Sequence, residues 1–269
     1  MLLIPFIIFI LVFFIYLHIQ YHLKTSNELK IYSISEVLSK EALEETCNIK
    51  QPVVFDVFFP ELNQIKTTNL NKDLGNRDIK IQEIGKQMVL LNVAKAVKLF
   101  EEDKKSLFYS HHNEALIKKY ILANTEFKKE LDYLCPPLCS FNKYDILFGS
   151  LHAKTQMQYH LNYRNYFIVT EGSVKIILLP PSTTVKDVSY NYNVFEFTCS
   201  QEDVSANPNV EIILTEGQLF YIPSNWWYSI EFTEKRTSVL SIQFQTWMNT
   251  LAILPYTGLH LIETYLPSK

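Results

Sequence analysis

The chain has 269 residues, 48% of them hydrophobic and 14% aromatic, so it can bury a large core and is not a disordered protein. Its net charge of -3 excludes a general electrostatic attraction to nucleic acid, and no nucleic-acid partner is expected. Four cysteines are too few for a disulfide-rich scaffold, and we interpret them as buried or surface thiols.

The N-terminal segment is apolar. Residues 2–19 contain no charged side chain, and this length is about enough to cross the hydrocarbon core of a bilayer. A cleaved signal peptide would need a basic start and a small-residue cleavage site, and neither is present. We therefore expect an uncleaved, single-pass membrane anchor over residues 1–23. The lysines that follow it, Lys24, Lys30 and Lys40, favour a cytosolic location for the rest of the chain.

Helices and loops are expected next. Residues 24–50 read as a polar linker with a short helix capped by Ser33 or Ser35, and residues 51–59 as a buried strand. Residues 67–80 read as a loop, and residues 85–134 as a helical segment that includes one amphipathic helix. His111 and His112, which precede that helix, are expected to be solvated.

From Lys143 onward the pattern changes to short strands separated by turn signals. Nine are predicted, over residues 144–149, 156–163, 165–172, 174–181, 193–200, 210–217, 218–224, 227–233 and 237–247. Because no long helical pattern interrupts them, they indicate a sandwich or a barrel. Residues 251–269 are expected to form a C-terminal helix. The predicted fold class is mainly β with flanking helices.

Three segments resemble a known family. They are "QPVVF" (51–55), "NYFIVTEGSVKIILLPP" (165–181) and "EGQLFYIPSNWWYSIEF" (216–232). The third is the most specific, because its Gly, Ile, Pro and paired Trp residues fall at matching spacing. Together they resemble the cupin-like, JmjC-related branch of the Fe(II)/2-oxoglutarate oxygenases, and also uncharacterised cupin-like proteins of large DNA viruses and algae. The resemblance implies a double-stranded β-helix (jelly-roll) in a domain over residues 51–250.

The resemblance also implies a metal site that this chain has changed. Such enzymes hold Fe(II) by two histidines and one carboxylate. The corresponding residues here are His160, Asn162 and Tyr228, of which asparagine carries no charge and tyrosine replaces the second imidazole. The lysine that binds 2-oxoglutarate is replaced by Val174, and the next residue, Lys175, should point to the opposite strand face. We expect no bound metal, with His160 and Asn162 as the only residual ligands, and neither Fe(II) nor 2-oxoglutarate as a cofactor.

A retained pocket at the barrel mouth is the functional interpretation of this region, and simple aromatic packing is the alternative. Arg164 is its expected charged anchor, because arginine pairs bidentately with carboxylate or phosphate. His152 is a less favoured candidate for an additional metal ligand. The candidate pocket residues are Thr155, Tyr159, His160, Asn162, Tyr163, Arg164, Asn165, Lys175, Trp227 and Tyr228. The ligand would be a protein segment, a peptide or a small polar molecule.

The sequence thus favours a membrane-anchored relative of the oxygenases that binds or scaffolds rather than oxidises. Two alternatives remain open: an active Fe(II)/2-oxoglutarate-dependent protein hydroxylase with an unusual metal site, and a non-iron cupin enzyme that uses His160 as its acid/base. No catalytic residue is assigned. We also expect the strand with residues 159–163 to lie beside the strand with residues 227–230, although the two are distant in sequence.

Overall fold

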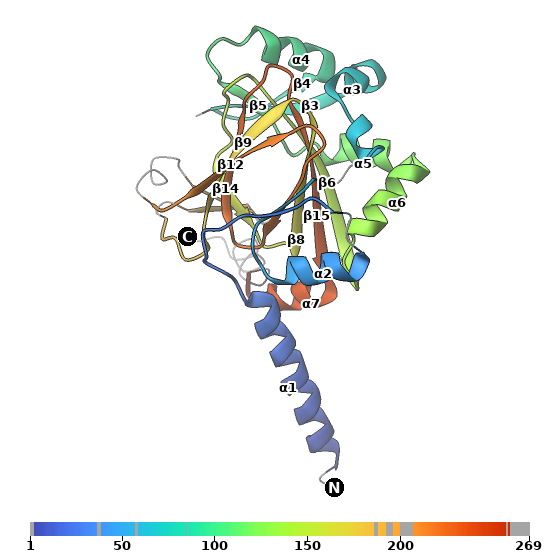
Figure 1. The fold of residues 1–269 in the computed structure, drawn as a ribbon, viewed down its shortest axis with the longest axis vertical. Helices are drawn as coiled ribbons and strands as arrows, with labels where there is room; N and C mark the ends of the chain where they lie inside the picture. Colours follow the sequence, from blue (N-terminus) through green and yellow to red (C-terminus); the bar gives the residue numbers. More distant parts are fainter. Residues whose placement is uncertain are drawn as a thin grey trace, which may run out of the picture.

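The computed structural model describes residues 3–36, 39–56, 59–84, 86–185, 188–191, 196–199, 207–256 and 258. Within them the chain is mainly β: two sheets face one another, helices cover the outer face of the larger sheet, and one apolar helix projects from the N-terminal end (Figure 1).

The projecting helix is α1 (Leu3–Leu23), and none of its residues is buried. It has a mean hydropathy of 2.5 and is the one helix in the described residues that is long and apolar enough to cross a membrane. Its 21 residues span ~32 Å, close to the thickness of a bilayer's hydrocarbon core. A signal sequence has the same two properties.

The larger sheet has nine strands, which lie in the spatial order β1 (Tyr32–Ile34), β2 (Val53–Phe55), β13 (Leu219–Pro223), β8 (Arg164–Glu171), β15 (Ser238–Thr246), β6 (Cys139–Gly149), β5 (Phe108–Ser110), β3 (Asp78–Glu83) and β4 (Val89–Asn92). The smaller sheet has six, which lie in the order β10 (Ser189–Asn191), β11 (Glu196–Cys199), β7 (Met157–His160), β14 (Trp227–Phe232), β9 (Ser173–Leu179) and β12 (Val210–Thr215). All described pairings are antiparallel except β1 with β2.

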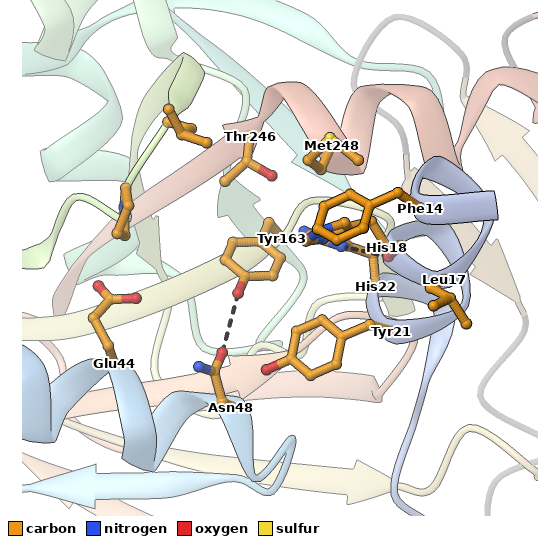
Figure 2. Close-up of a pocket in the computed structure, with 12 residues that line it drawn as sticks. Phe14, Leu17, His18, Tyr21, His22, Glu44, Asn48, Tyr163, Thr246 and Met248 are labelled. Carbon is orange, nitrogen blue, oxygen red and sulfur yellow. Dashed lines mark hydrogen bonds between the residues drawn. The ribbon is translucent and has the colours of Figure 1, made fainter. Parts of the chain in front are cut away.

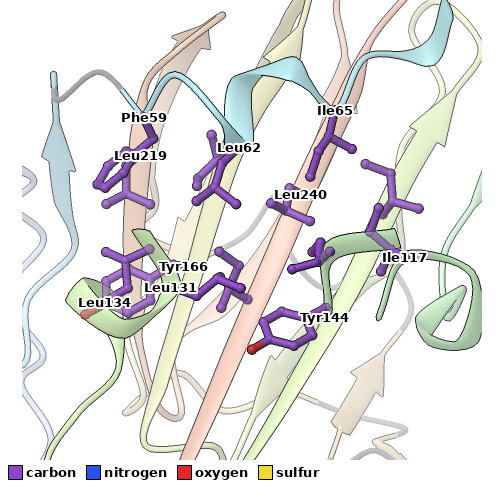
Figure 3. Packing of buried hydrophobic residues seen from close by; sticks show 14 of the residues in the cluster. Phe59, Leu62, Ile65, Ile117, Leu131, Leu134, Tyr144, Tyr166, Leu219 and Leu240 are labelled. Carbon is purple, nitrogen blue, oxygen red and sulfur yellow. The ribbon is translucent and has the colours of Figure 1, made fainter. Parts of the chain in front are cut away.

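Side chains alternate across the larger sheet, as the pleat requires. On β8, Tyr166 and Ile168 face the helices, whereas Phe167 and Val169 face the smaller sheet. The strand is therefore buried on both faces, which explains the continuous apolar run over residues 166–169 at its centre. The helix-facing core is closed by α2 (Lys40–Asn48), the short 3₁₀ turn η1 (Leu62–Gln64), α3 (Thr67–Leu74), α4 (Val93–Glu102), α5 (Glu114–Leu122) and α6 (Thr125–Leu134) (Figure 3).

All nine strands predicted from Lys143 onward are present, as β6–β9 and β11–β15, and β10 was not predicted. The expectations for residues 24–134 need correction. The short helix begins at Lys40 with Ser39 as its cap, because the Ser39 hydroxyl accepts a hydrogen bond from the Ala42 amide at 3.2 Å. Residues 67–80 form α3 and the start of β3 rather than a loop.

The segment 85–134 is only partly helical. It contains β4 and β5 as well as α4, and its amphipathic stretch is broken into α5 and α6 at Ala123 and Asn124. The Asn124 side chain accepts from the Glu126 amide at 2.9 Å, which caps α6 and ends the continuity. The last helix, α7 (Trp247–Ala252), begins before residue 251. Most of the expected helix 251–269 lies outside the described residues.

Candidate functional site

The space between the two sheets is apolar at one end and polar at the other. The apolar part gathers side chains from both sheets, such as Val174, Ile176 and Phe220. The polar part contains buried side chains from β6, β7, β11, β14 and β15, namely Asp145, Gln158, His160, Glu196, Tyr228 and Gln243. Burying polar groups costs free energy unless they are hydrogen-bonded. A sandwich core that places this many together is therefore a candidate functional site.

One continuous hydrogen-bonded chain runs through this polar part. The Gln158 amide donates to the Tyr228 hydroxyl at 2.9 Å, and that hydroxyl lies 2.6 Å from His160 Nε2. Gln243 continues the chain, with its Nε2 at 3.3 Å from His160 Nε2 and its Oε1 accepting from Asn162 Nδ2 at 2.8 Å. The strand pairing that brings Tyr228 opposite Gln158 confirms that β7 and β14 are neighbours.

The direction of these hydrogen bonds sets the role of His160 Nε2. An amide NH₂ can only donate, so Gln158 makes the Tyr228 oxygen an acceptor and leaves its proton to be given to His160. Gln243 Nε2 donates to the same imidazole nitrogen. In this arrangement His160 Nε2 accepts from two donors, Tyr228 and Gln243.

A buried carboxylate, Glu196 on β11, completes the cluster. Its Oε2 lies 3.7 Å from His160 Nε2, and its Oε1 lies 3.6 Å from His112 Nε2. Burial alone would raise the pKa of Glu196, but the hydrogen bond with His112 and the neighbouring imidazoles outweigh that effect and lower the pKa to about 2. Glu196 is thus ionised between two imidazoles although only 4% of its side chain is exposed.

His112 is held in place by Asp145 on β6. The Asp145 carboxylate accepts from the backbone amides of His112 at 2.7 Å and of Asn113 at 2.6 Å. The backbone at His112 has a φ of 59°, a strained conformation that these two hydrogen bonds maintain. The expectation that His111 and His112 are solvated was wrong: both are only partly exposed, their rings are in tilted contact at 3.9 Å, and burial together with His112 lowers the pKa of His111 to about 3.

A cavity of about 460 Å³ opens onto this corner of the cluster. Its lining includes His112 and Lys143 together with Lys80 and Lys118, balanced by Asp78 and Glu114. Lys143 lies on β6 two residues before Asp145 and is itself buried. Because His112 contacts both the cavity and Glu196, it connects the outside of the domain to the buried polar chain.

In the ranges that the structure describes, no group of three or more His, Cys, Asp or Glu side chains is arranged to hold a metal ion. The three residues aligned with the oxygenase ligands do come together, since His160 bonds to Tyr228 and Asn162 joins them through Gln243. These side chains satisfy one another by hydrogen bonds, so an ion bound by them would first have to displace that network.

Other expected pocket residues are distributed over different faces. Thr155 accepts from the Ile230 amide at 2.9 Å, and Asn165 donates to the Ile222 carbonyl at 3.3 Å, so both are structural. Val174 lies in the inter-sheet core, and Lys175 points outward to Glu211 at 2.6 Å, which confirms the predicted alternation. His152 is on the surface, 3.3 Å from Glu231.

Tyr159 and Trp227 face away from the cluster, on the outer side of the smaller sheet. Their rings meet edge to face at 4.5 Å, and Tyr159 also stacks on Phe197 at 4.5 Å. Both line a second cavity of about 470 Å³. They are therefore not part of the same pocket as His160.

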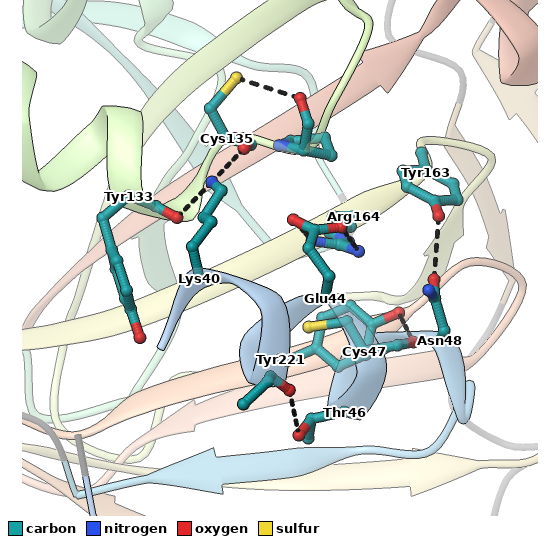
Figure 4. A network of polar contacts seen from close by, with 12 residues as sticks. Lys40, Glu44, Thr46, Cys47, Asn48, Tyr133, Cys135, Tyr163, Arg164 and Tyr221 are labelled. Carbon is teal, nitrogen blue, oxygen red and sulfur yellow. Dashed lines mark hydrogen bonds and ion pairs between the residues drawn. The ribbon is translucent and has the colours of Figure 1, made fainter. Parts of the chain in front are cut away.

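Arg164 and Tyr163 lie on the helix side of the larger sheet. The Arg164 guanidinium forms a bidentate ion pair with Glu44 of α2, at 2.8 and 2.5 Å, and only 1% of its side chain is exposed (Figure 4). The hypothesis that Arg164 anchors a ligand beside His160 is therefore wrong, because its charge is already paired across the sheet from the cluster. Tyr163 donates to Asn48 Oδ1 at 3.0 Å on the same side.

Sequence reasoning missed Glu196, His112 and Gln243. The Gln243 position could have been found, because an alternating strand that places Ser241, Gln243 and Gln245 on one face puts polar groups where apolar ones are expected.

No protein-family model matches the sequence, and no curated protein matches it either.

Proposed function

We propose that this protein is a membrane-anchored binding protein, built on the double-stranded β-helix of the 2-oxoglutarate oxygenases, in which the metal positions have become a hydrogen-bonded polar cluster. Two features support the fold. The two sheets, whose strands are mostly antiparallel and do not follow sequence order, enclose one apolar core between them. The second feature is that β7 and β14, the strands on which such enzymes carry their ligands, are neighbours.

The observation that carries the proposal is the pair of donors aimed at His160 Nε2. Tyr228, which stands where the second histidine is expected, gives its hydroxyl proton to the nitrogen that would bind iron. Gln243 donates to the same atom. Asn162, in the place of the carboxylate, supplies no negative charge and is engaged with Gln243. Of the two imidazoles and one carboxylate that hold Fe(II) in such enzymes, only one imidazole is present at these positions.

A binding role needs a way into the domain, and the cavity at His112 and Lys143 offers one. A small polar ligand in this cavity would meet the imidazole of His112 and the ammonium of Lys143 at its inner end. The helix α1 would hold the domain at a membrane by a single pass. The three lysines Lys24, Lys30 and Lys40 that follow it favour a cytosolic domain.

The test is a metal and turnover assay on the full-length protein in detergent. The expected result is that the protein neither retains Fe(II) through gel filtration nor releases succinate from 2-oxoglutarate. Iron-dependent release of succinate would overturn the proposal, and the active-hydroxylase alternative would replace it.

One observation favours that alternative specifically. His112, Glu196 and His160 supply two imidazoles and a carboxylate, with both nitrogens within 3.7 Å of the carboxylate oxygens, but in the described structure they are not arranged to hold a metal ion and would have to move to do so. This set of residue types suits a divalent metal, although its members come from segments other than those of the family pattern. If metal binds here, Glu196→Gln should abolish it, whereas Asn162→Ala should leave it unchanged. His160 acting alone as an acid/base finds less support, because only 3% of its side chain is exposed.

A further inference from the structure

We propose that the space between α1 and the rest of the protein accepts one acyl chain of a membrane lipid, an inference that rests on α1 crossing the bilayer as proposed above. A cavity of about 650 Å³ lies there, within the range of ~300–1,000 Å³ that is typical of small-molecule sites. Figure 2 shows its two sides: Phe14 and Leu17 on α1, and Met248 on α7.

The apolar side chains that line part of the cavity favour a hydrocarbon ligand. Phe14 and Leu17 of α1, together with Leu138 and Met248, supply the apolar lining of the space, and none of the α1 residues is buried by the domain. In a bilayer the open side of such a cavity borders lipid tails, so water cannot fill it favourably and leaving it empty forfeits dispersion contacts. An acyl chain from the adjacent leaflet satisfies both requirements.

The polar end of the cavity is internally paired. The Tyr163 hydroxyl donates to Asn48 Oδ1 at 3.0 Å, His22 Nδ1 bonds to the His18 carbonyl at 2.8 Å, and the Glu44 carboxylate is occupied by Arg164. These groups therefore close the inner end without offering an uncompensated charge to a headgroup. The geometry is suited to holding a chain by its apolar length rather than by its charge.

A second observation places the mouth of this cavity at the membrane surface. Leu138 and Trp247 are 72% and 64% exposed, and the Trp247 amide donates to the Leu138 carbonyl at 3.2 Å, so these two exposed residues adjoin at the backbone; we refer to the pair as the patch. Figure 1 shows α7, which carries Trp247, at the end of the domain from which α1 projects. Tryptophan favours the interface between headgroups and tails. The patch thus sets Leu138 and Met248 at the depth where acyl chains begin.

The experiment uses the full-length protein in phosphatidylcholine vesicles that contain a phosphatidylcholine with a diazirine on one acyl chain. After illumination, cross-linked residues are identified by mass spectrometry. We expect cross-links on Leu138, on the domain side of the cavity, in addition to those on the outer surface of α1. Met248→Trp, which fills the cavity, should lower the Leu138 cross-link by about tenfold, equivalent to ~1.4 kcal/mol. Met88→Trp, the same substitution just before β4, should leave it unchanged.

Alkaline carbonate extraction of the same vesicles separates this inference from the proposal it rests on. If the protein stays in the pellet but cross-links only on α1, or if the two variants label Leu138 equally, the lipid site is wrong and the anchor stands. If the protein is released into the supernatant, the anchor fails and the lipid site fails with it. Retention together with the selective loss in Met248→Trp supports both.

Discussion

The hydroxyl oxygen of Tyr228 lies 2.6 Å from Nε2 of His160, so the two side chains that the sequence aligns with metal-binding histidines are bonded directly to each other. Gln158 donates to the Tyr228 hydroxyl, and Gln243 donates to His160 Nε2. The nitrogen that could bind an ion is thus engaged in a chain of hydrogen bonds, and the expected behaviour on mutation follows from that arrangement.

Introducing the ligands that the resemblance to the oxygenases implies should create a metal site. In the double variant Asn162→Asp with Tyr228→His, a carboxylate and a second imidazole replace the amide and the phenol beside His160. Loss of supporting groups alone typically costs ~10–100-fold in metal affinity, so regaining two direct ligands should strengthen Co(II) or Fe(II) binding by at least that factor. Isothermal titration calorimetry measures it. Tyr228→Phe removes the same hydroxyl without adding a ligand and should show no gain; equal affinity in all three proteins would contradict the prediction.

Removing only the Tyr228 hydroxyl should destabilise the protein. Tyr228→Phe leaves Gln158 and His160 without their shared partner in a buried site, and such losses cost ~1–3 kcal/mol. Denaturant titration of the full-length protein in detergent measures the free energy of unfolding. The matched control is Tyr120→Phe, whose hydroxyl makes an exposed contact of 3.3 Å with Asp73 and should cost little. Equal effects of both substitutions would show that the buried network contributes nothing.

Glu196 should make stability depend on acid. Its pKa is lowered from 4.5 to about 2 in the folded state, so its contribution is present above pH 4.5 and is lost as the pH falls from 4.5 toward 2. The full shift corresponds to about 3 kcal/mol. Glu196→Gln should therefore lower the free energy of unfolding at pH 7. At pH 3 the free energies of unfolding of the variant and the unmodified protein should differ by less. The surface variant Glu211→Gln serves as the control, and a gap that is the same at both pH values would refute the assignment.

Lys50 should also make stability rise with pH, but in an alkaline range and because burial disfavours its charged form. It is buried after α2 beneath Tyr163, with its Nζ 4.3 Å from the ring centroid. Burial first, and then Arg164, lower the pKa of Lys50 from 10.5 to about 8. The unfolded chain thus holds this proton more tightly, and the free energy of unfolding should rise as the pH increases from 8 through 10.5.

Lys50→Met should remove this pH dependence and raise stability at pH 7, by up to about 3 kcal/mol. Lys50→Arg keeps the charge at every pH and should also remove the dependence, but at the lower stability. Thermal unfolding between pH 7 and 10.5 distinguishes the three proteins. A Lys50→Met variant that is less stable than the unmodified protein at pH 7 would mean that the contact with Tyr163 outweighs the cost of burial.

Local patterns were sufficient for much of the fold. The strands after Lys143 were predictable because alternating or continuously apolar runs end at clear turns, and β8 and β14 are examples. Residues 67–80 were not, because α3 is rich in Thr, Asn and Asp, whose low intrinsic helix preference is overcome by burial of Leu70.

The site was predictable only where it lies on recognisable segments. His160, Asn162 and Tyr228 could be brought together because their motifs fix which strands pair. Glu196 could not, since its place beside His160 depends on the register of β11 against β7, which pairs these two residues directly. Arg164 was misplaced for the reverse reason: one step along β8 moves a side chain to the other face of the sheet, where Glu44 pairs with it.

The connection between α1 and the sheet limits where this protein can act. Helix α1 ends at Leu23 and β1 begins at Tyr32, so eight residues, 24–31, join them. Even fully extended, they would reach only ~27 Å. The parallel pairing of Tyr32 with Val53 fixes the far end of this connection in the sheet. With α1 anchored in a membrane, as proposed above, a partner in the same membrane would therefore meet the domain at a high effective concentration, so that even weak contacts would suffice for complex formation, whereas a partner in bulk solution would gain no such advantage.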